Sequence, residues 1–152
     1  MKVQHGTSVL VVDGRKALLL RNEGDGTYPD FRVIRKWEQE LPPDRELKSQ
    51  RPGRTFNSQA HGKRRSAYEE TDFHQQAEND FASKAADYVN EQLQLETIDD
   101  LIIVAPPITL GAIRKDLRRD LADHIVAEID KDLVKHPVEA IADLIISYPE
   151  PA

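Results

Sequence analysis

The sequence contains no cysteine, and this absence removes several classes of site at once. Disulfides, thiolate zinc sites, iron–sulfur clusters and cysteine nucleophiles all require the missing thiol. A chain of 152 residues still buries roughly 68–70% of its unfolded surface, so one hydrophobic core stabilises it without cross-links. The length fits a single domain over residues 1–152, and the lack of thiols fits a reducing compartment, so we expect a cytoplasmic protein.

Long apolar runs are missing as well. The longest, residues 101–105, is far below the ~20 residues that a membrane-spanning helix needs. Near the N-terminus, the short apolar stretch of residues 9–12 runs directly into Asp13-Gly14, which is not the pattern of a secretory signal peptide. We therefore expect no membrane partner.

The common signatures of cofactor and metal sites are also absent. The seven glycines form no G-x-G-x-x-G, P-loop or G-x-S-x-G motif, so nucleotide cradles and serine-hydrolase elbows have no support. No histidine stands at metal-ligand spacing from another, and we expect surface or capping roles for all of them: His5, His61, His74, His124 and His136. The sequence predicts no bound metal and no cofactor.

Positive charge is scarce overall but concentrated in one place. The formal net charge is −6, which alone argues against binding a polyanion. Between residues 44 and 66, however, seven Lys or Arg residues stand against two acids: Arg45, Lys48, Arg51, Arg54, Lys63, Arg64 and Arg65. The stretch also contains Pro52, Gly53 and Gly62 and few apolar residues, so it predicts a basic flexible loop at about residues 44–70. A solvated charged loop without a binding role is the alternative.

The first part of the chain has the pattern of an antiparallel meander. An apolar run over residues 7–12 stops at Asp13-Gly14 and resumes over residues 17–20, which predicts a hairpin. A third strand is expected over residues 31–37, before Pro42-Pro43. Three successive strands with short connections pair as a meander.

The remainder of the chain alternates between helical and strand patterns. A long helix is expected from an N-cap at Asp72, because apolar residues then recur every four positions: Ala77, Phe81, Ala85, Val89 and Leu93. The continuous apolar run of residues 101–105 predicts a strand buried on both faces. Three elements follow it: a helix with Leu110, Ile113, Leu117 and Leu121 on one side, a strand over residues 126–133, and a last helix opened by Pro137.

The order β-β-β-α-β-α-β-α predicts an α/β fold of the ribonuclease-H-like class, a mixed five-stranded sheet with helices on its faces. The predicted core is residues 101–104, flanked by Phe81, Val89, Leu110, Ile113 and Leu117. Pro106-Pro107 predicts a rigid strand-to-helix turn, after which Gly111 lets the helix approach the sheet. A ligand site beyond the carboxyl end of the strand is the alternative.

This fold class suggests a two-metal nuclease, whose chemistry needs carboxylates that hold two metal ions. Asp13 at the end of the first strand and Glu78 on the first helix are available. Asp99 and Asp100 precede the fourth strand and so lie at the opposite end of the sheet. The acidic set is incomplete, and Asp13 before Gly14 is better explained as a turn residue.

Several segments together resemble the bacterial host-attachment protein family, described as proteins required for attachment to host cells. These segments are residues 9–17 (VLVVDGRKA), 53–58 (GRTFNS), 66–68 (SAY), 72–74 (DFH), Phe81-Ala82, 103–107 (IVAPP) with Leu110-Gly111, and 126–133 (VAEIDKDL). The resemblance covers nearly the whole chain. That family is in turn similar to the central domain of archaeo-eukaryotic peptide release factors, which has the same order of strands and helices.

The release-factor resemblance gives the basic loop a possible chemistry. In those factors the loop between the third strand and the first long helix carries Gly-Gly-Gln and lies next to the ester of peptidyl-tRNA. The present chain has Asn57-Ser58-Gln59 in its basic loop. The resemblance implies that Gln59 takes the place of the water-positioning glutamine, whereas Asn57 and Ser58 restrict φ where glycine is free.

Three functions are therefore considered. As a binding module, the protein contacts RNA phosphates on tRNA or the ribosome through five cations: Arg51, Arg54, Lys63, Arg64 and Arg65. As an enzyme, it hydrolyses peptidyl-tRNA through Gln59 and an ordered water. As an adhesion-related module, it binds another protein, an acidic one if the basic loop is the contact. We expect RNA binding, with an indirect effect on host attachment; the oligomeric state is not predicted.

Overall fold

The computed structural model describes the backbone of residues 1–40 and 60–151, and the side chains of residues 1–40 and 73–151. The basic segment predicted at residues 44–70 therefore lies partly outside the described residues.

The strands form one mixed sheet in the order β3-β2-β1-β4-β5. β1, β2 and β3 pair antiparallel, as expected of a meander, whereas β4 pairs parallel with both β1 and β5. The strands are Ser8–Val12 (β1), Lys16–Asn22 (β2), Phe31–Glu38 (β3), Leu101–Ala105 (β4) and Ile125–Asp130 (β5). The predicted ribonuclease-H-like sheet is confirmed.

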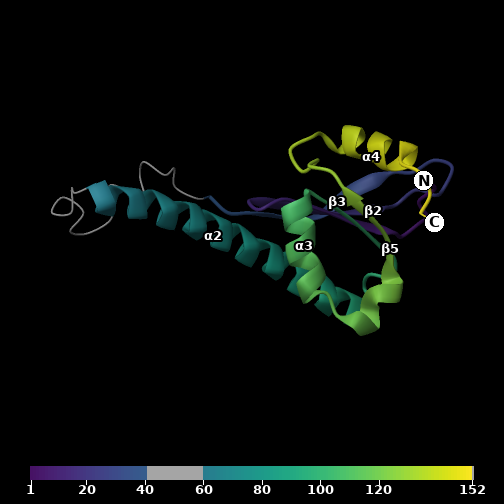
Figure 1. Ribbon diagram of the computed structural model, residues 1–152. Coiled ribbons are helices and arrows are strands. Elements are labelled where there is room, and N and C mark those ends of the chain that lie inside the picture. Colours follow the sequence, from purple (N-terminus) through teal and green to yellow (C-terminus); the bar gives the residue numbers. More distant parts are fainter. Residues whose placement is uncertain (41–59, 152) are drawn as a thin grey trace.

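Helices cover both faces of the sheet (Figure 1). α2 (Ala60–Gln94) and α3 (Pro107–Asp116) pack on one face, and α4 (Val138–Ser147) packs on the other. A 3-10 helix, η2 (Arg119–His124), leads from α3 to β5. Among the described residues, no helix combines the length and the apolar character needed to span a membrane.

β4 lies at the centre of the core. All five of its residues are buried, because strands flank it on both sides and helices cover both of its faces. Leu101 and Ile103 face α2 and α3, whereas Ile102 and Val104 face α4. The predicted neighbours in the first of these layers are buried as well: Phe81, Val89, Leu110 and Ile113.

The turn between β1 and β2 is built around Asp13. Its Oδ1 accepts hydrogen bonds from the backbone N–H of Arg15 and of Lys16, both at 2.8 Å. The backbone N–H of Asp13 donates to the carbonyl of Lys16, which closes the turn. This confirms Asp13 as a turn residue.

The long helix begins earlier than predicted. α2 starts at Ala60 and not after an N-cap at Asp72, so residues 60–70 are helical and do not belong to a loop. This stretch is rich in Ala, Lys, Arg and Glu, which have high helix propensity, but it lacks the apolar repeat that marks a packed helix. A search for hydrophobic periodicity therefore missed it.

The second helix ends earlier than predicted. α3 stops at Asp116, so Leu117 and Leu121 are not on it: Leu117 is extended and half-buried, and Leu121 lies in η2. Asn90 of α2 stabilises this end, because its Nδ2 donates to the carbonyl of Asp116 at 2.7 Å. Its Oδ1 also accepts from the backbone N–H of Arg118 at 3.1 Å. Leu117 and Leu121 still pack against the core, which explains the misleading helical spacing.

Two smaller predictions were also wrong. A Cβ added to Gly111 would have no neighbour within 4 Å, so the glycine is not required for α3 to approach the sheet. β5 ends at Asp130, and Leu133 is buried from the connection between β5 and α4. Leu133 fitted the alternation of a strand and Gly111 stood at the start of a helix, but neither pattern tests the actual contacts.

We predict that Ile103→Ala lowers the free energy of unfolding by about 2–5 kcal/mol, because it leaves a cavity in a strand buried on both faces. Ile108→Ala is the matched control, since Ile108 is 67% exposed on α3 and its truncation opens no cavity. Chemical denaturation of both variants measures the difference. Equal losses for the two variants would contradict the central place of β4.

Candidate nucleic-acid interface

The structure places the predicted site residues only in part. Arg51, Arg54 and Gln59 lie in residues 41–59, outside the described residues. Lys63, Arg64 and Arg65 lie on the first two turns of α2, where the backbone is described and the side chains are not. The described site is therefore the scaffold around this segment: the end of β3, the β1–β2 turn and α2.

α2 carries its first turns away from the sheet. With 35 residues it is about 52 Å long at 1.5 Å per residue. Among its described side chains, the first buried one is Phe81. Figure 1 shows the N-terminal part of the helix extending beyond the sheet. Lys63, Arg64 and Arg65 thus belong to the projecting end.

The other half of α2 is fixed to the sheet. The helix contributes small residues that allow it to lie close to the strands, Ala82, Ala85 and Ala86, and larger ones that fill the layer, Phe81, Val89 and Leu93. Ser83 Oγ also donates to the carboxylate of Asp116 at 2.6 Å, next to the Asn90 contacts. A helix held this firmly at one end defines the direction of its free end.

Gln39 joins the end of β3 to the β1–β2 turn and to α2. Its backbone N–H donates to the carbonyl of Arg15 at 2.8 Å. Its side-chain Nε2 donates to the carbonyl of Gly14 in the β1–β2 turn and to that of Ala77 in α2, both at 3.0 Å. The end of β3 is thereby fixed against the turn and the helix.

Gly14 allows the turn to reach the helix. A Cβ at this position would lie 2.6 Å from the Cβ of Glu78 and 2.1 Å from its Oε2, closer than real Cβ contacts. The neighbouring Arg15 Nε lies 3.9 Å from Glu78 Oε1, so an ion pair borders the same contact. Only glycine fits here without a shift of the turn or of Glu78.

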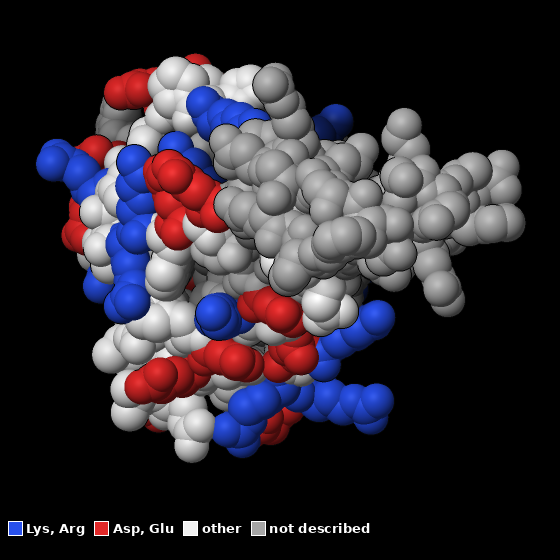
Figure 2. Space-filling model, turned by 90° about the vertical axis from the view of Figure 1, so that its left-hand side faces the viewer, with Lys and Arg blue, Asp and Glu red and all other residues white. Residues whose placement is uncertain are grey.

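Most described cations near this scaffold already face an acid. Lys16 Nζ and Lys36 Nζ lie 4.0 Å and 3.5 Å from Glu38 Oε1. Arg32 binds both carboxylate oxygens of Asp30, and this pairing raises the pKa of Arg32. On the face shown in Figure 2, basic and acidic side chains lie side by side around the grey atoms. The described scaffold is therefore not strongly basic.

Arg35 is bound differently. No described carboxylate pairs with it; its guanidinium lies 5.1 Å from the ring centroid of Trp37 and 4.5 Å from that of Tyr88. The two rings meet edge to face at 5.0 Å. At these distances the electron-rich ring faces attract the cation, whose N–H groups form no ion pair with a described acid. Sequence reasoning missed this cluster, because Tyr88 is on α2 and only Arg35 and Trp37 are near in sequence.

The acids considered for a nuclease serve other purposes. Asp13 Oδ1 accepts the backbone N–H groups of Arg15 and Lys16 in the β1–β2 turn. Glu78 lies against the same turn, at Gly14 and Arg15. Within residues 1–40 and 73–151, no group of three acidic or histidine side chains is arranged to hold a metal ion. Among the described residues, Asp13 therefore shapes the turn and Glu78 borders its contact with α2.

We predict that Gln39→Ala lowers the free energy of unfolding by about 1–3 kcal/mol, because it leaves two carbonyls without their side-chain donor. Gln75→Ala is the matched control: Gln75 is exposed, and among the described residues its Nε2 donates to Asn79 Oδ1 on the same helix. Thermal and denaturant unfolding compare the variants. An effect of Gln39→Ala no larger than that of Gln75→Ala would show that the bridge does not hold the scaffold.

A comparison with known protein families identifies the chain. The model for bacterial archaeo-eukaryotic release factor family 12 matches residues 6–145, which include all five strands, α2 and α3. This supports the release-factor part of the resemblance noted above, whereas host attachment is not in the family's description. No curated protein matches the chain.

Proposed function

The chain belongs to the bacterial archaeo-eukaryotic release factor family 12, and from this premise we propose that it binds RNA, as tRNA or within the ribosome, through the basic segment of residues 44–66, which precedes α2 and continues onto its first two turns. The observation that carries the proposal is the charge of this segment: seven cations against two acids, in a chain whose net charge is −6. Its position, after the third strand and into the first long helix, is that of the functional loop in the release factors that the chain resembles.

The proposed contacts are mainly to phosphates. Arg51 and Arg54 precede α2 in the sequence, and Lys63, Arg64 and Arg65 lie on its first two turns, at the projecting end. Phosphate contacts position a protein without reading sequence, and little base preference is expected. The acidic remainder of the chain repels the same polyanion and so restricts binding to this end. A cytoplasmic location is part of the same proposal, because tRNA and ribosomes are found there.

The scaffold supports this orientation. Gln39 fixes the point where the segment leaves β3, and the packed half of α2 fixes the helix into which it leads. Arg35, whose guanidinium lies against the rings of Trp37 and Tyr88, adds a cation that has no partner among the described carboxylates near this point. A single strand that follows the segment would meet both a phosphate contact and aromatic edges there.

We predict that RNA affinity falls linearly on a plot of log K against log salt, with a slope of about 0.7 per phosphate neutralised on a single strand. Replacing Lys63, Arg64 and Arg65 by Ala should lower both the affinity and the slope. Replacing Lys115, Lys131 and Lys135 removes the same charge from exposed positions elsewhere and should change both less. Fluorescence anisotropy with labelled tRNA and co-sedimentation with ribosomes provide the measurements.

Binding that is undetectable, or independent of salt, would overturn the RNA proposal. The basic segment would then be a contact for an acidic protein partner, the adhesion-related alternative considered from the sequence.

Peptidyl-tRNA hydrolysis is the second candidate function, favoured by the position of Gln59 directly before the first residue of α2. In this mechanism the side-chain carbonyl of Gln59 accepts a hydrogen bond from a water, whose oxygen attacks the ester carbonyl. The bond between the acyl carbon and the tRNA 3′ oxygen breaks, and a proton passes to that oxygen. Backbone N–H groups of the loop stabilise the oxyanion, a contribution of roughly 10²–10³ in rate per donor.

We predict that Gln59→Ala abolishes this hydrolysis and leaves RNA affinity unchanged, because the substitution removes no charge. Release of labelled peptide from peptidyl-tRNA on ribosomes measures turnover, and anisotropy measures affinity. Lack of turnover by the unmutated protein would exclude the enzyme function only, and leave RNA binding to be judged by its salt dependence.

A further inference from the structure

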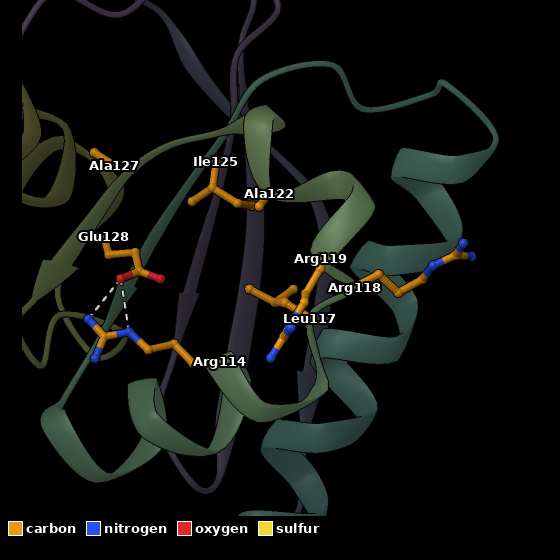
Figure 3. Close-up of a pocket in the computed structure, with 8 residues that line it drawn as sticks. All are labelled: Arg114, Leu117, Arg118, Arg119, Ala122, Ile125, Ala127 and Glu128. Atoms are coloured by element: carbon orange, nitrogen blue, oxygen red, sulfur yellow. Dashed lines mark hydrogen bonds and ion pairs between the residues drawn. The ribbon is translucent and has the colours of Figure 1, made fainter.

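A pocket of about 540 Å³ opens between α3, η2 and β5 (Figure 3). Its volume falls within the range of roughly 300–1,000 Å³ that is usual for small-molecule sites. The residues that line it are Arg114, Leu117, Arg118, Arg119, Ala122, Ile125, Ala127 and Glu128. It lies near the sheet end of α2, away from the projecting turns, and so is separate from the proposed RNA contact (Figure 1).

Two irregularities of the fold create this space. The register between β4 and β5 shifts, so that Leu101 pairs with Ile125 but Ile102 pairs with Ala127. Ile125 and Glu128 therefore lie on the same face, the one that α3 covers, although they are three residues apart. The early end of α3 at Asp116 sends the chain through Leu117 into η2, so that α3, η2 and β5 together border the pocket.

Two of the three arginines are occupied by acids. Arg114 donates from Nε and Nη2 to Glu128 Oε2, at 2.9 Å and 2.7 Å, and the pairing raises the pKa of Arg114. Arg118 binds Asp120 through Nε and Nη2 and donates from Nη1 to Gln94. Figure 3 shows Arg118 directed away from the pocket toward α2. Neither pair leaves a net charge.

Arg119 provides the unbalanced charge. It lines the pocket, and no described residue forms an ion pair or hydrogen bond with its side chain. In Figure 3 its guanidinium turns toward the end of the pocket where Arg114 lies. The Arg114 guanidinium lies beside Glu128 and apart from that of Arg119 (Figure 3). The remaining lining is apolar: Leu117, Ala122, Ile125 and Ala127.

We propose that this pocket binds a small molecule that carries one carboxylate on an apolar body. The single unbalanced cation matches one negative charge, and an Arg fork matches the geometry of a carboxylate. A phosphate dianion would meet the carboxylate of Glu128 with only one cation to offset its two charges. The apolar body of the ligand would cover Leu117 and Ile125, which are half-buried at present.

The test uses benzoate as the probe, with benzamide as its neutral counterpart and inorganic phosphate as the dianion, all at constant ionic strength. Methyl and amide NMR spectra of the full chain follow Leu117 and Ile125. Benzoate should cause saturable shifts at both residues, with an affinity at least about tenfold higher than that of benzamide or phosphate, as expected of a charged hydrogen bond.

Variants identify the group responsible. Arg119→Ala should abolish the preference for benzoate over benzamide, and Arg119→Lys should restore part of it. Arg118→Ala removes the same charge from a side chain directed away from the pocket and should leave the preference intact. Arg119 is exposed, so its replacement should not unfold the protein; unchanged spectra elsewhere establish this.

The proposal would be overturned by the absence of a saturable shift with benzoate, by equal affinity for benzamide, or by a preference for benzoate that survives Arg119→Ala. A higher affinity for phosphate than for benzoate would do so too. None of these results affects the RNA proposal, because RNA affinity is tested with substitutions of Lys63, Arg64 and Arg65 at the other end of α2.

Discussion

The burial of β4 on both faces is the constraint on which the remaining structure depends. Side chains alternate along a strand, so Leu101 and Ile103 require one apolar layer and Ile102 and Val104 another. The layers are supplied by α2 with α3 and by α4. Parallel pairing of β4 with β1 also requires a long connection from the preceding meander. α2 is that connection: its packed half serves the core, and its other half is free to project.

Apolar patterns made most of the fold predictable from the sequence. Where burial repeats with a regular period, as in β4 or around Ile141 and Ile145 of α4, the pattern indicates both the element and its buried face. The first turns of α2 lack any such repeat, so the apolar pattern did not indicate that they are helical. Leu117 and Leu121 show the opposite error, because residues in an extended link and a 3-10 helix can be buried at helix-like spacing.

The sequence predicted the positive charge of the candidate site but not the contacts between its residues. The concentration of Lys and Arg between residues 44 and 66 is visible in the sequence alone. Gln39 donates a hydrogen bond to Ala77, which is 38 positions further along the chain. Arg35 lies against the ring of Tyr88, which is 53 positions further along. No local sequence pattern indicates such distant partners. For the same reason no sequence pattern indicated the pocket, because Arg119 lies on η2, whereas Arg114 and Glu128 come from α3 and β5.

Ion pairing explains where unbalanced charge can act. Exposed pairs such as Lys36 with Glu38 contribute at most about 1 kcal/mol to stability, so their main effect is to neutralise the surface. Around such pairs the field largely cancels, and a charged ligand gains little by approaching. The basic segment has too few acids for this cancellation, and Arg119 has no described partner at all. The two places differ in kind: the basic segment has many cations close together in the sequence, as the proposed contact with an extended polyanion requires, whereas the pocket has one cation beside an apolar lining, as the proposed contact with a compact monoanion requires.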